Sequence, residues 1–381
     1  MTIEDFRIDV PDDVLDDLAG RLARSRPPAA PVRDGGESPE TVARIEELVS
    51  YWRDGYDWRA NERRLNAQPH HRTTVDGAGL HFLHVPGTGP DPLPLLLSNG
   101  WPSSFVEYLP ALRALTDPAS VGGDPADSFT VVIPAHPGYG FSDSCADRDG
   151  VTREWIADLY DTLMTERLGY HRYVAHGDDI GGGVVSRLGL RHPETVAAIQ
   201  VANWMAPRLG PDTPPLTPAE EAYQANVAEW RRTEGAYAHV QATRPQILAY
   251  ALNDSPQGLA AWILEKFLTW SDPATRDRLS ADDLLTTVMI YWVTGSIGSS
   301  ARLYAEAPKP PEAGEAVSVP TSILVPREPR LMVPPEAWLR RVYPRLDRYQ
   351  VVEAGGHFLG LEATETLVNA LRDAFRPYRT V

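Results

Sequence analysis

The stretch YVAHGDDIGGGVV, residues 173–185, constrains the fold more than any other part of the chain. It joins an apolar strand to a helix through a cluster of glycines and two aspartates. A strand-to-helix turn this sharp strains the backbone of the residue at its apex. The residues two before, two after and three after the apex must therefore be small. Such a turn, the nucleophile elbow, raises one side chain above the end of the sheet.

This steric rule distinguishes the two adjacent aspartates. The neighbours that it restricts around Asp179 are all glycines, namely Gly177, Gly181 and Gly182. Around Asp178, two of the corresponding neighbours, His176 and Ile180, are bulky. We therefore expect Asp179 at the apex and Asp178 turned away from the reaction centre. A plain structural turn and a phosphate-binding helix N-terminus are the alternatives, although two carboxylates would repel a phosphate.

An aspartate at an elbow indicates a particular chemistry. Its carboxylate is ionised at neutral pH, needs no base to activate it, and can displace a leaving group from saturated carbon. The chain contains no G-x-S-x-G motif, which argues against a serine hydrolase. We therefore expect Asp179 to be the nucleophile.

The segments around the elbow predict an α/β fold with a mostly parallel central sheet. Short apolar runs end at glycine, proline or tryptophan, as in PLPLLLSNG, FTVVIPAHPGYG and VAAIQVANW. Helical segments such as TREWIADLYDTLMTERLG separate these runs, an order that is typical of a parallel sheet with helices on both faces. Before them, HRTTVDGAGLHFLHVPG alternates in polarity and contains a DG turn, which predicts a two-stranded hairpin.

The sheet pattern is interrupted after Trp204. A Pro-rich linker leads into a helical, aromatic stretch that ends near residue 305, and a second linker precedes the return of the sheet pattern. We therefore divide the chain into an N-terminal extension that wraps the core and includes the first strands (1–85), a first core part (86–205), a helical cap (206–310) and a second core part (311–381). In the extension, Asp12 or Asp13 is expected to cap the first helix and Ser38 the second.

Elbow enzymes place their catalytic groups in the chain order nucleophile, acid, histidine. Three histidines follow Asp179, namely His192, His239 and His357. His357 follows the last apolar strand, YQVVEAGGH, and is expected to be the base. Glu328 is the first carboxylate after the strand TSILV and is expected to orient the imidazole and stabilise its charged form. Glu336, which begins a helix, and Glu353, inside the last strand, are the alternatives for the acid.

The early strand PLPLLLSNG runs into the turn NGWPSS, which occupies the position that normally contributes one backbone N–H to an oxyanion hole. We expect the two donors to be the N–H groups of Trp101 and of Ile180, the residue after the nucleophile. Pro102 fixes the turn, and the Trp101–Pro102 bond is of the X–Pro type that tolerates a cis geometry. Trp101, Pro102 and Ile180 are also expected to contact the substrate.

Composition argues against several other classes of function. The formal net charge of −16 disfavours a nucleic-acid partner, which would require a basic face. The single cysteine, Cys145, excludes an internal disulfide and any metal site with two or more cysteines. The acidic N-terminus MTIEDFRIDVPDD does not read as a signal peptide, and no run reaches the roughly 18–20 apolar residues of a bilayer span. We expect a soluble, cytoplasmic protein without metal, organic cofactor or membrane contact.

With these residues in place, the sequence resembles the epoxide hydrolases of the α/β-hydrolase superfamily, in particular the microsomal-type branch with an extended N-terminal segment. The resemblance covers nearly the whole chain and rests on YDWRANERRLNAQPHHRTTVDGAGLHFLHV, NGWPSSFVEYLPAL, PAHPGYGFSD, EGAYAHVQATRPQILAYALNDSPQGLAAWILEKF, VPREPRLMVPPEAW and AGGHFLGLE. It implies an α/β-hydrolase fold with an inserted helical cap and two cap tyrosines that hold the epoxide oxygen. By motif these are Tyr237, in EGAYAHVQ, and Tyr304, in SSARLYAEA.

The sequence departs from the family pattern at three points. The residue after the nucleophile is usually Trp and here is Ile180, which keeps the backbone N–H but changes the pocket wall. The usual His of the oxyanion turn is Asn99. No membrane anchor like that of the animal microsomal enzymes is recognised, and a soluble form is expected.

The resemblance therefore implies an enzyme that opens an epoxide to a vicinal diol, with the epoxide and water as its partners. Asp179 would form a covalent ester, Tyr237 and Tyr304 would hold the ring oxygen, and His357 with Glu328 would activate water. The expected substrate is a hydrophobic or aryl epoxide, with a role in specialised metabolism, and a homodimer is left open. The alternatives are a haloalkane or haloacid dehalogenase that uses the same aspartate and a non-catalytic binding protein of the same fold.

Overall fold

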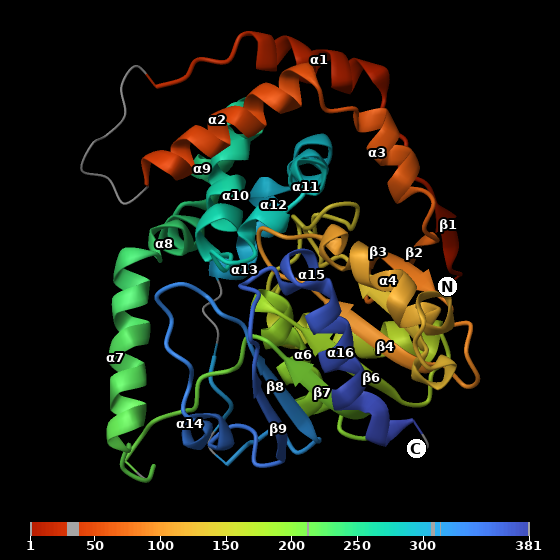
Figure 1. Ribbon diagram of the computed structural model, residues 1–381, viewed down its shortest axis with the longest axis vertical. Coiled ribbons are helices and arrows are strands. Elements are labelled where there is room, and N and C mark those ends of the chain that lie inside the picture. The colour runs from red at the N-terminus through yellow and green to blue at the C-terminus, as the bar shows by residue number, and fades with distance from the viewer. Residues whose placement is uncertain (1, 29–37, 212, 306–308, 313, 380–381) are drawn as a thin grey trace.

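The computed structural model describes residues 2–28, 38–211, 213–305, 309–312 and 314–379. Within them, nine strands form one sheet in the order β1-β2-β3-β5-β4-β6-β7-β8-β9 (Figure 1). The strands are β1 (Glu4–Phe6), β2 (His70–Val75), β3 (Ala78–Val85), β4 (Leu93–Ser98), β5 (Phe129–Pro134), β6 (Tyr173–Gly177), β7 (Val196–Val201), β8 (Thr321–Val325) and β9 (Leu346–Val351).

The sheet is parallel from β5 to β9 and antiparallel over β1, β2 and β3. Every residue of β5, β6, β7 and β8 is buried, as expected for strands of a parallel sheet that is covered on both faces. The predicted hairpin is β2–β3. Its turn residues Asp76 and Gly77 both have positive φ angles, 47° and 78°, the signature of the tight turn that matches the strand twist.

Sixteen α-helices lie in the described residues. They are α1 (Asp12–Ala23), α2 (Pro39–Asp54), α3 (Trp58–Leu65), α4 (Leu109–Thr116), α5 (Arg153–Thr162), α6 (Asp179–Arg191), α7 (Pro218–Thr233), α8 (Ala236–Thr243), α9 (Pro245–Asp254), α10 (Pro256–Trp270), α11 (Ala281–Thr294), α12 (Ile297–Ser300), α13 (Arg302–Ala305), α14 (Glu336–Arg340), α15 (Leu359–Glu362) and α16 (Thr364–Phe375). Figure 1 shows α4 and α16 together in front of the strands, and α5 packs on α6. The α/β-hydrolase fold that the resemblance implied is confirmed.

The helices α7 to α13, called the inserted helices below, separate β7 from β8 in the chain. Figure 1 shows α8 to α13 above the end of the sheet, with α7 at its side. The division of the chain into four parts stays a prediction. Its boundary at residue 310 lies beside residues 306–308 and 313, which are outside the described residues.

The N-terminal helices lie on the inserted helices as well as beside the sheet. The strand β1 pairs with β2 at the sheet edge, whereas α2 packs on α10 and α3 on α11 (Figure 1). Four side-chain contacts join the two groups of helices: Arg21–Asp254 at 2.7 Å, Tyr51–Asp282 at 2.8 Å, Tyr56–Thr286 at 2.9 Å and Arg64–Asp283 at 2.8 Å. The segment therefore connects the far edge of the sheet to the helices above it.

One of the two predicted helix caps is wrong. Ser38 accepts a hydrogen bond from the backbone N–H of Thr41 at 3.1 Å, as expected at the start of α2. At the start of α1 the cap position is Pro11, and no side chain caps the helix. Asp12 lies in the first turn instead, where a carboxylate favours the helix dipole, and its side chain pairs with Arg59.

No helix in the described residues has both the length and the apolar sequence that crossing a membrane would require.

Candidate active site

The elbow has the geometry that the glycine pattern predicts. Asp179 is the first residue of α6, directly beyond β6, and its φ of 42° lies in the left-handed region that a non-glycine residue rarely adopts. Side chains at the three restricted positions would collide with backbone: at Gly177 with Gly181, at Gly181 with Ser98 and at Gly182 with Asn203. The strained angle at the apex is therefore held by close backbone packing on three sides.

Asp178 faces the interior of the core. Its carboxylate accepts a hydrogen bond from the hydroxyl of Tyr108 at 2.6 Å, and the residue is only 7% exposed. Burial raises the pKa of Asp178 to about 7, since a charged carboxylate is costly away from water. The two neighbouring aspartates thus differ in environment, and Asp179 is the one that reaches the pocket.

His357 and Glu328 meet Asp179 at the ends of two neighbouring strands. Glu328 follows β8 and His357 follows β9. The imidazole Nδ1 lies 2.8 Å from Glu328 Oε1, and Nε2 lies 3.7 Å from Asp179 Oδ2. A ring that donates its Nδ1–H to Glu328 presents Nε2 to the pocket, where it can take a proton. The three residues predicted from chain order are therefore adjacent in space, although their roles stay predictions.

Three carboxylates control the charge of this histidine. Burial acts to lower the pKa of His357, but the negative charges of Glu328, Asp179 and Asp178 outweigh it and raise the pKa to about 10. Because two of these charges lie on the elbow itself, the pKa depends on whether Asp179 is ionised. Neutralising Asp179 would lower it.

A buried carboxylate that the sequence did not single out fixes the loop of His357. Glu362, in α15, accepts hydrogen bonds from the backbone N–H groups of Gly356 and Phe358, each at 2.9 Å, on both sides of the histidine. It also accepts from Asp272 N and Thr275 Oγ1, each at 2.9 Å. The residues just beyond α10 and the loop that carries the histidine are therefore held by one side chain.

The predicted oxyanion turn lies against the nucleophile. The backbone N–H of Trp101 donates to Asp179 Oδ1 at 3.0 Å, and the Trp101–Pro102 bond is cis. A side chain at Gly100 would collide with Asp179, so glycine permits this close approach. Ile180 supplies the other predicted donor. Its N–H lies in the first turn of α6, where backbone donors have no acceptor within the helix.

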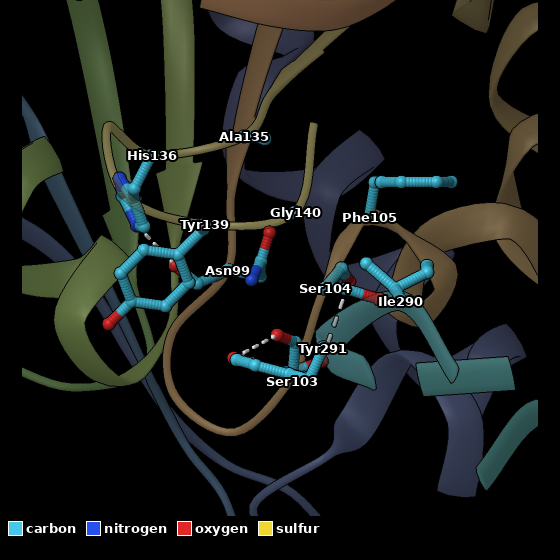
Figure 2. A pocket seen from close by; sticks show the side chains of 10 residues that line it. All are labelled: Asn99, Ser103, Ser104, Phe105, Ala135, His136, Tyr139, Gly140, Ile290 and Tyr291. Atoms are coloured by element: carbon cyan, nitrogen blue, oxygen red, sulfur yellow. Dashed lines mark hydrogen bonds between the residues drawn. The ribbon is translucent and has the colours of Figure 1, made fainter. Parts of the chain in front are cut away.

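The turn is supported from behind by a histidine outside the predicted site. His136, in the loop after β5, contacts the carbonyl of Asn99 through Nε2 at 2.7 Å and the hydroxyl of Tyr160 through Nδ1 at 2.7 Å. Figure 2 shows the side chains of His136, Asn99 and Tyr139, which line a small pocket. The volume of this pocket is about 10 Å³. This volume is at the lower limit for a single water molecule, about 10–15 Å³, and is too small for a substrate.

The two predicted tyrosines form an aromatic cluster with the oxyanion turn. The ring of Tyr237, in α8, stacks on Trp101 at 5.3 Å, and Tyr304, in α13, meets Trp101 edge-on at 5.9 Å. The Tyr304 hydroxyl is buried, and among the described residues its one hydrogen-bonding neighbour is the hydroxyl of Tyr237. Burial raises the pKa of both hydroxyls well above the ordinary value, and the charge of Asp179 adds to the shift. Both are therefore neutral donors near the nucleophile.

A larger pocket of about 570 Å³ opens above the nucleophile. Asp179, Glu328, His357 and Tyr237 line it. Five further aromatic side chains contribute to its wall: Trp204, Tyr223, Trp230, Trp270 and Trp338. The three residues predicted to contact substrate, Trp101, Pro102 and Ile180, are buried and are not among the residues that line this pocket. Their contact with substrate stays a prediction.

No group of three or more His, Cys, Asp or Glu side chains in the described residues could hold a metal ion.

Comparisons with known proteins find similarity over nearly the whole chain. The family model described as "Epoxide hydrolase N terminus" matches residues 3–108, and the one described as "alpha/beta hydrolase fold" matches residues 94–295. A protein of Stigmatella aurantiaca that is provisionally named an epoxide hydrolase is 38% identical over 99% of this chain and 86% of its own. Epoxide hydrolase 1 of Oryctolagus cuniculus is 34% identical over 96% of this chain and 87% of its own.

Solved structures show the same similarity. The crystal structure of juvenile hormone epoxide hydrolase from the silkworm Bombyx mori aligns over 100% of this chain and 95% of that one, with a TM-score of 0.82 and 30% identity. The extended N-terminal segment and the core are both covered by these matches.

Proposed function

The chain belongs to the epoxide hydrolase family of the α/β-hydrolase fold, and from this premise we propose that it opens epoxides through a covalent ester on Asp179. One observation carries the proposal. Asp179 lies within reach of the N–H of Trp101 at 3.0 Å and of His357 Nε2 at 3.7 Å, in a pocket that Tyr237 also lines. Nucleophile, base and acid thus face the same volume.

In the first step, an Asp179 oxygen attacks one epoxide carbon and the C–O bond of the ring breaks. Tyr237 and Tyr304 hydrogen-bond the oxygen as it becomes an alkoxide, and one of them gives it a proton. General acid catalysis of this kind typically raises the rate by about 10²- to 10⁴-fold. The two hydroxyls are buried beside each other and close to the charge of Asp179, which supports this role because both can donate to one oxygen.

In the second step, water hydrolyses the ester. His357, oriented by Glu328 at 2.8 Å, takes a proton from water, and the hydroxide attacks the ester carbonyl. The N–H groups of Trp101 and Ile180 bind the oxyanion, and loss of one such donor typically costs about 3 kcal/mol. Ester formation removes the charge of Asp179, which makes His357 easier to deprotonate in the state in which it must act as a base.

We propose a hydrophobic or aryl epoxide as the substrate. The support is the aromatic wall of the pocket, in which Trp204, Tyr223, Trp230, Trp270 and Trp338 surround a volume of about 570 Å³. Pockets of roughly 300–1,000 Å³ accommodate drug-sized molecules. A role in specialised metabolism, a cytoplasmic location and homodimer formation stay predictions from the sequence.

A dehalogenase reaction is the second candidate, and one observation favours it. The indole N–H groups of Trp101 and Trp270 are buried without a hydrogen-bond partner among the described residues, and such donors suit a departing halide. Against it, Ile180 offers no side-chain donor, and two tyrosine hydroxyls suit an alkoxide better. Incubation with a panel of small haloalkanes and epoxides, with halide and diol both measured, separates the two reactions.

The ester can be trapped by removing the base. The variant His357→Gln should react with styrene oxide once and stop, so that the intact-protein mass rises by one substrate. The variant Asp179→Ala should gain no mass, and the wild-type protein should release diol. A His357→Gln protein that remains folded, gains no mass and still releases diol would contradict the proposed ester.

A further inference from the structure

A buried lysine lies against the ring of Tyr237, one of the two proposed proton donors. Lys266, in α10, is 8% exposed, although lysine is rarely buried so fully unless paired. Its ammonium lies 4.7 Å from the centre of the Tyr237 ring and 5.3 Å from that of Trp270. Its carboxylate partner is the neighbouring Glu265. A cation this close to a ring is attracted to the π-electrons of its face.

The Tyr237 ring contacts both the oxyanion turn and the cation. Trp101 stacks on Tyr237 at 5.3 Å with an angle of 11° between the planes, and the ammonium of Lys266 lies 4.7 Å from the centre of the same ring. Among the described residues, a cation lies over the Tyr237 ring and none over the Tyr304 ring.

The other charges near Tyr237 oppose its ionisation. After burial, the carboxylates of Asp179, Glu328 and Glu265 raise the pKa of this hydroxyl. A phenol in that environment donates a hydrogen bond readily but gives up its proton with difficulty. A positive charge on the ring face acts in the opposite direction, because it interacts more favourably with a phenolate than with a phenol.

We propose that Lys266 is a positioning residue that acts through Tyr237: its ammonium stabilises the negative charge that develops on this phenol as the proton moves to the epoxide oxygen. The inference rests on the proposed function. It also separates the two tyrosines, since Tyr237 becomes the proton donor and Tyr304 a hydrogen-bond donor only.

The step balances within the proposed reaction. A bond forms between an Asp179 oxygen and carbon, the C–O bond of the ring breaks, and its electron pair stays on oxygen. That oxygen takes the proton of Tyr237 and leaves a phenolate beside Lys266. Hydrolysis of the ester by one water molecule yields the diol and one proton, which passes through His357 and restores the phenol.

A single-turnover experiment with enzyme in excess over styrene oxide tests this role. Rapid quenching and intact-protein mass give the rates of ester formation and of ester decay separately. Lys266→Met, which keeps the length of the side chain but removes the charge, should slow ester formation by about 10- to 100-fold and leave ester decay within about twofold. Lys266→Arg, which keeps the charge, should recover most of the rate.

Two comparisons separate this role from a structural one. Glu265→Gln removes the carboxylate that opposes ionisation, so it should form the ester at least as fast as wild type, whereas a merely structural ion pair would lose rate in both variants. In the Tyr237→Phe background, Lys266→Met should cause no further loss, because the two residues would act as one unit. In the Tyr304→Phe background, Lys266→Met should still slow ester formation by its full factor.

Three results would overturn the inference: ester formation in Lys266→Met within about threefold of wild type, equal slowing of both steps, or a full effect of Lys266→Met in the Tyr237→Phe background. If Lys266→Met does not fold, Glu265→Gln decides, and slower ester formation in that variant rejects the inference. If the wild-type protein forms no ester at all, the proposed function fails instead.

Discussion

The loops that follow β6, β8 and β9 hold their side chains differently from the inserted helices above them. Asp179, Glu328 and His357 are fixed by a strained backbone and by hydrogen bonds: Asp179 lies at the elbow with a φ of 42°, and the side chains of Glu328 and His357 are joined by a hydrogen bond of 2.8 Å. Tyr237 and Tyr304 are held mainly by ring contacts, 5.6 Å from each other and 5.3 and 5.9 Å from Trp101. Hydrogen bonds fix direction closely, whereas aromatic contacts tolerate several geometries.

We propose that the two regions have different roles. In the proposed reaction, the loops at the ends of the strands supply the nucleophile and the base, which every substrate needs, whereas the inserted helices supply contacts that depend on the substrate. We expect variants of the first group to lose activity with all epoxides. Variants of the second group should change rate and preference together.

The largest effect should come from the nucleophile. Asp179→Ala should lower turnover of any epoxide by at least about 10⁴-fold, the scale typical of removing a covalent catalyst. The matched control is Asp178→Asn, one residue away, which keeps an acceptor for the Tyr108 hydroxyl and should stay within about tenfold of wild type. If Asp178→Asn is inactive and Asp179→Ala is active, with both proteins folded, the elbow assignment is wrong.

The tyrosines should come next. Tyr237→Phe and Tyr304→Phe should each slow ester formation by about 100-fold, within the range of general acid help, and the double variant should be slower still. Ester decay should hardly change, because neither hydroxyl takes part in it. Single-turnover mass measurements check both steps, and an equal loss in ester decay would contradict the division between the two regions.

A smaller effect concerns pH. Ester decay needs neutral His357, so its rate should rise with pH and then level off. The midpoint should lie below the value of about 10 that applies when Asp179 is charged, because the ester removes one of the charges that raise this pKa. Glu328→Gln should lower the midpoint further. Ester decay measured from pH 6 to 10 gives the midpoint, and a value above that of the free enzyme would contradict the argument.

The smallest effect should be on the preference between epoxide substrates. Trp230 lines the pocket, and Trp230→Ala should shift the ratio of kcat/KM between bulky aryl epoxides and styrene oxide by a few-fold to about tenfold in favour of the bulky ones. Tyr250→Ala is the control, since this side chain is 71% exposed on α9 and does not line the pocket. If Trp230→Ala lowered kcat/KM equally for all substrates, Trp230 would act in the reaction itself and not in substrate preference.

The same comparison explains which features could be predicted from the sequence. The elbow leaves a local pattern, because backbone packing around Asp179 allows only glycine at 177, 181 and 182. Chain order then indicated His357 and Glu328. Tyr237 and Tyr304 have no local signature, and only the family resemblance identified them.

Other features depend on contacts between distant segments. Lys266 looks like any polar residue of a helix until the fold brings it to Tyr237. Glu362 has no signature either, yet its carboxylate holds both sides of the histidine loop. The predicted substrate contacts of Trp101, Pro102 and Ile180 stay a prediction. These residues are buried and are not among those that line the pocket, although Trp101 stacks on Tyr237, which does line it.

The first three helices add no side chain to the pocket, yet they hold the inserted helices in place. Arg21 pairs with Asp254 at the end of α9, Arg64 pairs with Asp283 in α11, and α2 packs on α10. A shortened protein that starts after residue 65 would keep every residue that is assigned a role in the reaction. It would lose the contacts that hold the inserted helices, which carry Lys266 and Trp270. Inactivity of such a fragment would say nothing against the assignment of those groups. Libraries that vary the inserted helices to change selectivity should leave unchanged the residues that contact α1, α2 and α3.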